Sequence, residues 1–272
     1  MIYAVYFLLC FLATTAGAIS GIGGGVIIKP CMDALSGLDV TTVSFLSGCT
    51  VLAMSTVSLL RSIRLKRGAR KPDDALQLDL RVCILLAVGA AVGGAAGKAL
   101  FDGLGRALSD DGLIGALQSF LTLALTAGVF IYTLKKETIR QQHITNMAVI
   151  LAIGLLLGTS SSFLGIGGGP INIAVLSFFF AMNTKSCVLN SLFIILCSQM
   201  TSLIGTLVTA SWPPFDPGLL LLMISGGVTG GFVGAFLSKR MMPRHVDRLF
   251  CGMMLVIMGI SLYNGIQFLA VS

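Results

Sequence analysis

Long apolar stretches separated by short polar connections make up most of this 272-residue chain. A helix needs about 20 apolar residues to cross a bilayer. Eight stretches meet that length, approximately over residues 2–20, 40–60, 80–100, 113–134, 145–164, 186–209, 218–238 and 249–271. Two shorter apolar pieces, 24–37 and 170–182, follow glycine clusters and are predicted to be broken or re-entrant helices. The pattern therefore predicts an all-α integral membrane protein with eight long and two short helical segments.

Composition supports the membrane class and excludes several others. Apolar residues make up 56% of the chain and charged residues 11%, whereas soluble domains carry about 25% charge. The net charge of +7 comes from short connections, which excludes a soluble nucleic-acid-binding protein. The seven cysteines lie singly within apolar runs, so we interpret them as small buried side chains. No cofactor, metal site or catalytic constellation is predicted, and the first segment lacks the basic start of a cleaved signal.

The basic residues indicate how the segments are threaded. Thirteen of the 18 lysines and arginines fall in three clusters, around residues 61–71, 135–140 and 239–248. The positive-inside rule places all three in the cytoplasm, but eight simple crossings would put the third cluster on the opposite side. The conflict disappears if each glycine cluster is the tip of a hairpin that enters and leaves by one face. Two full crossings per hairpin would give the same parity, and either way both termini and the loop with Asp102, Asp110 and Asp111 are predicted to be external.

The chain contains an internal repeat. Gly21-Ile22-Gly23-Gly24-Gly25 recurs 144 residues later as Gly165-Ile166-Gly167-Gly168-Gly169, and Thr15 then aligns with Thr159 and Ser47 with Ser191. We expect one transmembrane domain made of two repeats, 1–143 and 144–272. Since the first begins outside and the second inside, they are predicted to be inverted, as in many secondary transporters.

The two glycine clusters are the predicted binding site. Each glycine costs a helix about 1 kcal/mol relative to alanine, so each run marks a break that exposes backbone groups. The helices that restart at Val26 and Pro170 would point free N–H groups at the cluster, which favours an anion. If the two tips meet near the membrane midplane, they can clasp one anion between them. Other glycines, at 89, 93, 97, 226, 230 and 234, have the spacing of close helix packing.

Hydroxyl, amide and ammonium groups near the clusters complete the candidate set, and the same surroundings contain Ser20, Ser161, Ser162, Ser198 and Gln199. The predicted substrate-binding residues are Gly21, Gly23, Gly24, Gly25, Gly165, Gly167, Gly168, Gly169, Pro170, Asn172, Thr15, Thr159, Ser160, Ser47, Asn190, Ser191 and Lys29. For each hydroxyl, the alternative is a hydrogen bond to its own helix backbone. For Lys29, the alternatives to attracting the anion are an ion pair with Asp33 and a side chain that extends outward to water.

The duplicated Gly-x-Gly-Gly-Gly motif resembles that of the TauE/SafE family, also called the TSUP or DUF81 permeases. A proline that we associate with the family appears as Pro30 but is replaced by Ala174 in the second half, where Pro170 directly follows the glycines. The resemblance implies a permease of the cytoplasmic membrane that moves sulfite, thiosulfate or an organosulfonate such as sulfoacetate.

The sequence favours a transporter that works by alternating access. Export suits an anion, because an inside-negative potential of about 100 mV supplies roughly 2.3 kcal/mol for each charge moved outward. The alternatives are an anion channel and an importer of another small anion coupled to a cation; an intramembrane enzyme lacks a nucleophile or ligand set. The expected partners are a small anion and the lipid bilayer, nucleic acid is not expected, and the sequence is compatible with a homodimer.

Overall fold

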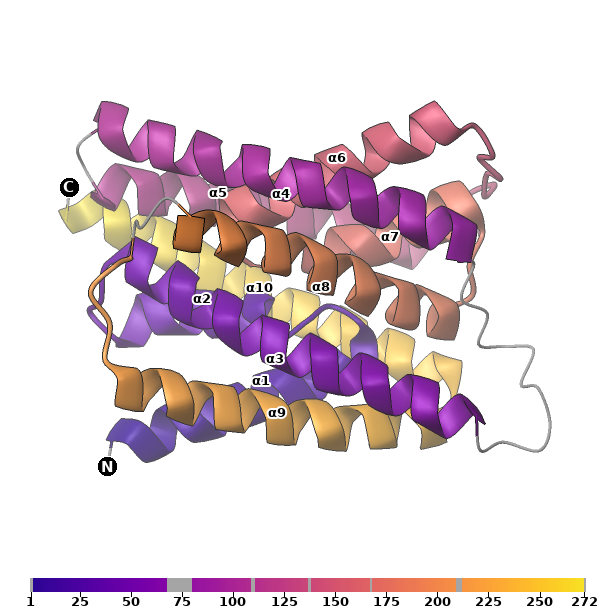
Figure 1. Cartoon of the computed structure of the whole chain (residues 1–272), viewed down its shortest axis with the longest axis horizontal. Helices are drawn as coiled ribbons and strands as arrows, with labels where there is room; N and C mark the ends of the chain where they lie inside the picture. Colours follow the sequence, from indigo (N-terminus) through magenta and orange to yellow (C-terminus); the bar gives the residue numbers. More distant parts are fainter. Residues whose placement is uncertain are drawn as a thin grey trace.

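A computed structural model describes residues 2–67, 80–108, 111–136, 138–166, 168–208 and 212–271. Every regular element in these ranges is a helix (Figure 1). The first half contains α1 (Ile2–Ser20), α2 (Gly25–Leu35), α3 (Val40–Arg67), α4 (Leu80–Leu108) and α5 (Asp111–Lys135). The second contains α6 (Met147–Leu164), α7 (Gly169–Phe180), α8 (Thr184–Val208), α9 (Pro217–Arg240) and α10 (Pro243–Val271).

The helix lengths follow from the apolar pattern. In the described ranges, eight helices are long and apolar enough to cross a membrane, while α2 and α7 have only 11 and 12 residues. At about 1.5 Å per residue, neither short helix spans a hydrocarbon core of about 30 Å. The predicted set of eight long and two short segments is confirmed. The predicted loop with Asp102, Asp110 and Asp111 was too long: Asp102 lies within α4, which continues past the apolar stretch to Leu108, and Asp111 begins α5. Asp110 lies outside the described residues.

Glycine stripes let two pairs of helices approach closely. Along α4, Gly89, Gly93 and Gly97 lie against the backbone of α6, with an added Gly89 Cβ only 2.9 Å from the Leu155 nitrogen. Along α9, glycines 226, 230 and 234 lie in the same way against the backbone of α1. Any larger side chain would push these helices apart, so the predicted packing role of these glycines is confirmed.

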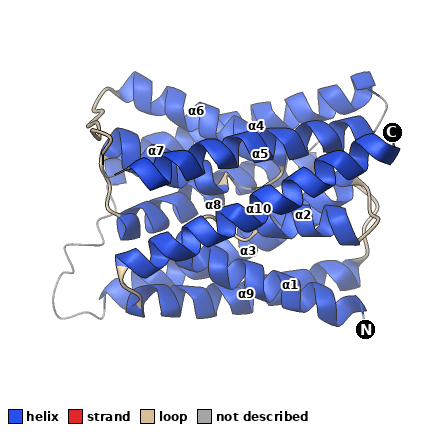
Figure 2. Ribbon diagram, turned by 180° about the vertical axis from the view of Figure 1, so that it is seen from behind, coloured by secondary structure: helices blue, strands red, loops and turns tan. Residues whose placement is uncertain are grey.

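The remaining helices surround the two glycine tips. In Figure 1, α3 and α8 cross the front of the molecule between the α4–α6 pair and the α1–α9 pair, and Figure 2 shows α5 and α10 across the back. Helices α2 and α7 occupy the interior, where α2 packs on α3 and α10, and α7 packs on α8 and α5. Each short helix thus packs on the next helix of its own half and on the last helix of the other half.

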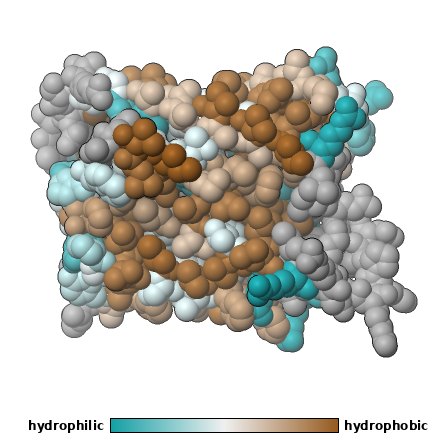
Figure 3. All heavy atoms as spheres, viewed as in Figure 1, coloured by the Kyte–Doolittle hydropathy of each residue, from teal (hydrophilic) through white to brown (hydrophobic). Residues whose placement is uncertain are grey.

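The two ends of the bundle differ in charge. The ends of α3, α5 and α9, where the predicted basic clusters begin, lie at the end of the molecule opposite to both termini (Figure 1). Arg70 and Lys71 of the first cluster lie outside the described residues. The surface between the ends is largely apolar, with hydrophilic side chains gathered toward the ends (Figure 3). This surface belongs to a multi-pass membrane protein; the external position of the termini stays a prediction.

Candidate functional site

Each glycine cluster forms a sharp turn between a long helix and a short one. The first follows α1, with Gly21 at φ +77° and Gly23 at φ +79°, and the second follows α6, with Gly165 at φ +65° and Gly168 at φ +79°. Side chains rarely tolerate this left-handed backbone, which explains the choice of glycine. Gly24 and Gly168 precede α2 and α7, and Pro170 lies in the first turn of α7. Gly167 lies outside the described residues.

The two tips touch each other inside the protein. An added Cβ on Gly25 would lie 2.9 Å from the Ile166 carbonyl oxygen, and one on Gly169 would lie 3.1 Å from the Ile22 carbonyl oxygen. Apolar side chains of both tips, including Ile22, Val26 and Ile166, share one buried cluster. Because the tips are in contact, a clasp of the predicted kind would require them to separate.

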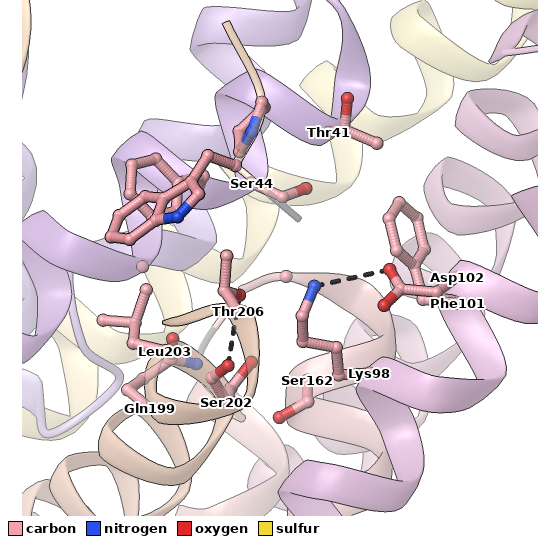
Figure 4. A pocket seen from close by; sticks show the side chains of 15 residues that line it. Thr41, Ser44, Lys98, Phe101, Asp102, Ser162, Gln199, Ser202, Leu203 and Thr206 are labelled. Carbon is pink, nitrogen blue, oxygen red and sulfur yellow. Dashed lines mark hydrogen bonds and ion pairs between the residues drawn. The ribbon is translucent and has the colours of Figure 1, made fainter. Parts of the chain in front are cut away.

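A cavity of about 320 Å³, which we call the vestibule, lies beside the second tip (Figure 4). Its lining comes from α3, α4, α6, α8 and the connection after α8: Thr41, Ser44, Phe45, Gly48, Lys98, Phe101, Asp102, Ser162, Gly165, Gln199, Ser202, Leu203, Thr206, Trp212 and Pro213. Trp212 and Pro213 lie in the α8–α9 connection, on the same end of the molecule as the termini, whereas Gly165 belongs to the interior tip. The vestibule therefore leads from one end of the bundle to the second glycine turn.

The inner part of the vestibule holds polar groups without partners. The hydroxyls of Ser44 and Ser162 are buried and make no hydrogen bond in the described structure. An added Cβ on Gly165 would lie 2.8 Å from Ser44 Oγ, so this hydroxyl borders the glycine turn directly. A buried hydroxyl without a partner is costly. These donors favour a ligand that accepts hydrogen bonds.

Lys98 and Asp102 form a half-exposed ion pair on the α4 wall. Lys98 Nζ lies 3.3 Å from Asp102 Oδ1, and Figure 4 shows the pair across the cavity from Ser202 and Thr206 of α8. The vestibule thus contains a cation whose charge is largely balanced. The sequence reasoning missed Lys98, although its i,i+4 spacing to Asp102 inside an apolar stretch was a usable signal.

Lys29 is buried behind the same turn. Its side chain is 3% exposed, and its Nζ donates to Asp33 Oδ2 at 3.1 Å and to Gln118 Oε1 at 2.9 Å. Its Cε lies 3.0 Å from the position of an added Gly165 Cβ. Of the three arrangements considered for Lys29, the structure contains the ion pair with Asp33.

The other predicted residues divide into two groups. Asn172 lies against Gly168, and its Oδ1 accepts no hydrogen bond from the described residues. The Ser47 hydroxyl is buried and likewise makes no hydrogen bond to them. Both groups can therefore still hydrogen-bond a ligand near the tips. Ser191 instead donates to the Gly21 carbonyl at 2.6 Å and holds the first tip in place.

Three more predicted residues form hydrogen bonds within the protein, and for a fourth the structure gives only its position. Thr15 and Thr159 donate to their own helices, at Phe11 and Leu155. Asn190 accepts from Cys83 and donates to the Ser186 carbonyl, away from the turns. Ser160 is half-buried on α6.

Described residues fill the place at the first tip that corresponds to the vestibule. Under the 144-residue repeat, Ser44 and Gly48 correspond to Val188 and Leu192, and Gly165 corresponds to Gly21. An added Gly21 Cβ would meet Val188 Cα at 2.6 Å. Val188 and Leu192 belong to an apolar cluster with Ala18, Ile19, Met54 and Val246. The space beside Gly165 is therefore open and bordered by the polar Ser44, whereas the corresponding space beside Gly21 is filled by the apolar Val188.

Comparison with known proteins gives the family. A family model described as "Sulfite exporter TauE/SafE" matches residues 6–262. This chain belongs to the TauE/SafE family. The TauE/SafE chain is also 23% identical to "Probable membrane transporter protein YunE" of Bacillus subtilis (strain 168), over 98% of this chain and 99% of the relative. It is 31% identical to a "Probable membrane transporter protein" of Xylella fastidiosa (strain 9a5c), over 45% of this chain and 47% of the relative. No solved structure gave a significant match.

The Lys29–Asp33 pair makes a stability prediction for this TauE/SafE protein. In Lys29→Met, the Asp33 carboxylate stays buried without its cation, so we expect a loss of about 3–5 kcal/mol, measured as a lower unfolding temperature in detergent. The double variant Lys29→Met/Asp33→Asn should recover most of the loss. Lys98→Met breaks the half-exposed pair with Asp102 and should lower the free energy of unfolding by only about 0–1 kcal/mol. Equal losses in Lys29→Met and Lys98→Met would contradict the conclusion that Lys29–Asp33 is the pair that stabilises the fold.

Proposed function

We propose that this TauE/SafE protein is a secondary transporter that carries a small sulfur-containing oxyanion outward across the cytoplasmic membrane. Sulfite, thiosulfate and organosulfonates such as sulfoacetate are the proposed substrates. The family description, with its sulfite exporters, supports this class. The observation that carries the proposal is the one-sided vestibule, which ends at Gly165 among partnerless hydroxyls while the equivalent space at Gly21 is filled.

The chemistry of the vestibule suits such an anion. Sulfur oxyanions present several acceptor oxygens, and Ser44, Ser162 and Gln199 offer hydroxyl and amide donors around one turn. Hydrogen bonds to a charged partner are stronger than those between neutral groups. Lys98 adds a cation on the facing wall, and Asp102 moderates its charge so that the anion can leave again.

Alternating access would exchange the states of the two tips. In the proposed cycle, the vestibule at Gly165 closes while Val188 and Leu192 move away from Gly21 and open a path to the basic end. The inverted relation of the halves is part of this proposal: α1 begins at the end that carries the termini, and α6 begins at the opposite end (Figure 1). Such repeats can exchange conformations about one central site.

Counter-transport in proteoliposomes tests the function. Vesicles loaded with unlabelled sulfite should take up external ³⁵S-sulfite faster than vesicles loaded with chloride, and uptake should saturate. Flux that neither saturates nor responds to internal sulfite would point to a channel instead. Uptake that requires an imposed cation gradient would point to a coupled importer, and absence of flux for every sulfur anion would contradict the proposed substrate class.

A further inference from the structure

Cationic donors without hydrogen-bond partners among the described residues lie at the basic end of the bundle, away from the vestibule. Arg61, near the end of α3, has its Nε and Nη1 buried without a hydrogen-bond partner in the described structure. Its guanidinium carbon lies 3.3 Å from the centre of the Phe232 ring and 5.3 Å from that of Phe236. The faces of the rings stabilise the positive charge but accept none of these N–H bonds. The donors of Arg61 therefore lack an anion.

Arg240 brings a second guanidinium to the same place. Its guanidinium carbon lies 4.2 Å from the centre of the Phe236 ring, so both arginines border one aromatic side chain. Among the described residues, each aspartate that forms an ion pair does so with a lysine elsewhere, at Lys29, Lys98 and Lys136. Within the part of the chain that the structure describes, the two arginines thus form a pair of cations without a carboxylate partner.

The surroundings identify the membrane as the source of that counter-charge. Phe232 and Phe236 are 53% and 37% exposed and lie one turn apart on α9, so they face the surface that lipid covers. The apolar span of α3 ends at Ser62 and that of α9 at Arg240, which places both guanidinium groups at one membrane boundary. Hydrophilic atoms adjoin apolar surface over these helix ends (Figure 3). Lipid phosphates lie at this depth.

We propose that Arg61 and Arg240 bind the phosphate of an anionic phospholipid, whose acyl chains lie along Phe232 and Phe236. The planar guanidinium groups suit a phosphate, since each can donate two parallel hydrogen bonds. The exposed rings give acyl chains an apolar surface that a free phosphate ion does not use. The bound lipid links the ends of α3 and α9, helices that pack on each other along the bundle.

Native mass spectrometry of the purified full chain tests the site, with titrations of dioleoylphosphatidylglycerol and dioleoylphosphatidylcholine. The wild-type protein should retain one phosphatidylglycerol more tightly than phosphatidylcholine. Arg61→Gln and Arg240→Gln should each weaken that retention about tenfold, the loss of one strong charge-assisted contact. Arg61→Lys should weaken it as well, because the ammonium keeps the charge but loses the stacked planar fork.

Arg244→Gln is the matched control, because Arg244 is exposed at the same end of the molecule. It removes one charge and should leave lipid retention unchanged. Equal loss in Arg244→Gln would reduce the effect to general surface charge and overturn the site. Displacement of the lipid by inorganic phosphate at the same molar concentration as the lipid would show that the site binds a soluble anion. Unchanged lipid retention in both Arg61 variants would also refute the proposal.

Discussion

Replacing Gly165 by valine is expected to reduce ³⁵S-sulfite uptake in proteoliposomes to the level of empty vesicles, while the protein still inserts and purifies as a single species. The Cβ would lie 2.8 Å from Ser44 Oγ and 3.0 Å from Lys29 Cε, at a φ of +65° that valine rarely adopts. The larger side chain would fill the inner end of the vestibule and push against the hydroxyl that we assign to the anion. A β-branched residue at this φ adds strain of about 1–3 kcal/mol.

Gly37 provides a control with matched backbone geometry. It has a similar φ of +63°, but an added Cβ would meet no atom within 4 Å. Gly37→Val therefore introduces comparable backbone strain without entering the vestibule, and it should retain most of the flux. Equal loss of flux in both variants would attribute the effect to strain, and normal flux in Gly165→Val would remove the vestibule from the transport path.

The second large effect is expected for the double variant Ser44→Ala/Ser162→Ala. A hydrogen bond to a charged group contributes about 1.5–3 kcal/mol, so losing two should raise the sulfite concentration for half-maximal uptake by about 100-fold or more. Both hydroxyls make no hydrogen bond to the described residues, so the unfolding temperature without substrate should not fall. Binding and stability are therefore expected to respond differently.

Ser225→Ala is the control for the loss of a hydroxyl. Ser225 is exposed on α9 and donates to the Leu222 carbonyl of its own helix, so its removal should change neither uptake nor stability measurably. A drop in the unfolding temperature of the double variant, with unchanged half-saturation, would mean that Ser44 and Ser162 serve the fold instead of the substrate.

The fold could be predicted because a membrane allows few backbone structures to cross it. Spans must be long and apolar, and backbone that breaks inside the bilayer must be enclosed by protein. The five-residue glycine runs marked two such breaks, and the structure places both turns in the interior. The lengths of α2 and α7 also distinguish re-entrant helices from thin full spans, a choice that the basic residues alone left open.

Most of the vestibule could not be predicted, because it is formed by tertiary packing of helices that are distant in sequence. Of its lining residues, Gly165 was a predicted binding residue, and Ser162 and Gln199 were among the hydroxyl and amide groups expected around the tips. The signal was nevertheless present: Thr41, Ser44 and Gly48 on α3, like Gln199, Ser202 and Thr206 on α8, follow the same i, i+3, i+7 spacing. This spacing places small or polar groups on one face of each helix. Which face meets a cavity depends on how α3, α4 and α8 pack together.

The repeat also shows why the glycine motif alone could not predict where the vestibule lies. Both tips carry the same glycines, yet the residue facing Gly165 is Ser44 and the residue facing Gly21 is Val188. Among the described residues, the polar space that Ser44 borders at Gly165 is filled at Gly21 by Val188. The two tips therefore differ in this structure through the residues that surround them, and not through the shared motif.

The most direct test is a thermal-shift screen of the purified protein against sulfite, thiosulfate, sulfoacetate, sulfate, chloride and acetate. It should be run in parallel on Ser44→Ala/Ser162→Ala. We predict that at least one of sulfite, thiosulfate and sulfoacetate raises the unfolding temperature of the wild-type protein, that chloride and acetate do not, and that the double variant loses the response. Equal stabilisation of both proteins, or no response to any sulfur oxyanion, would contradict the assignment of the vestibule as the anion site.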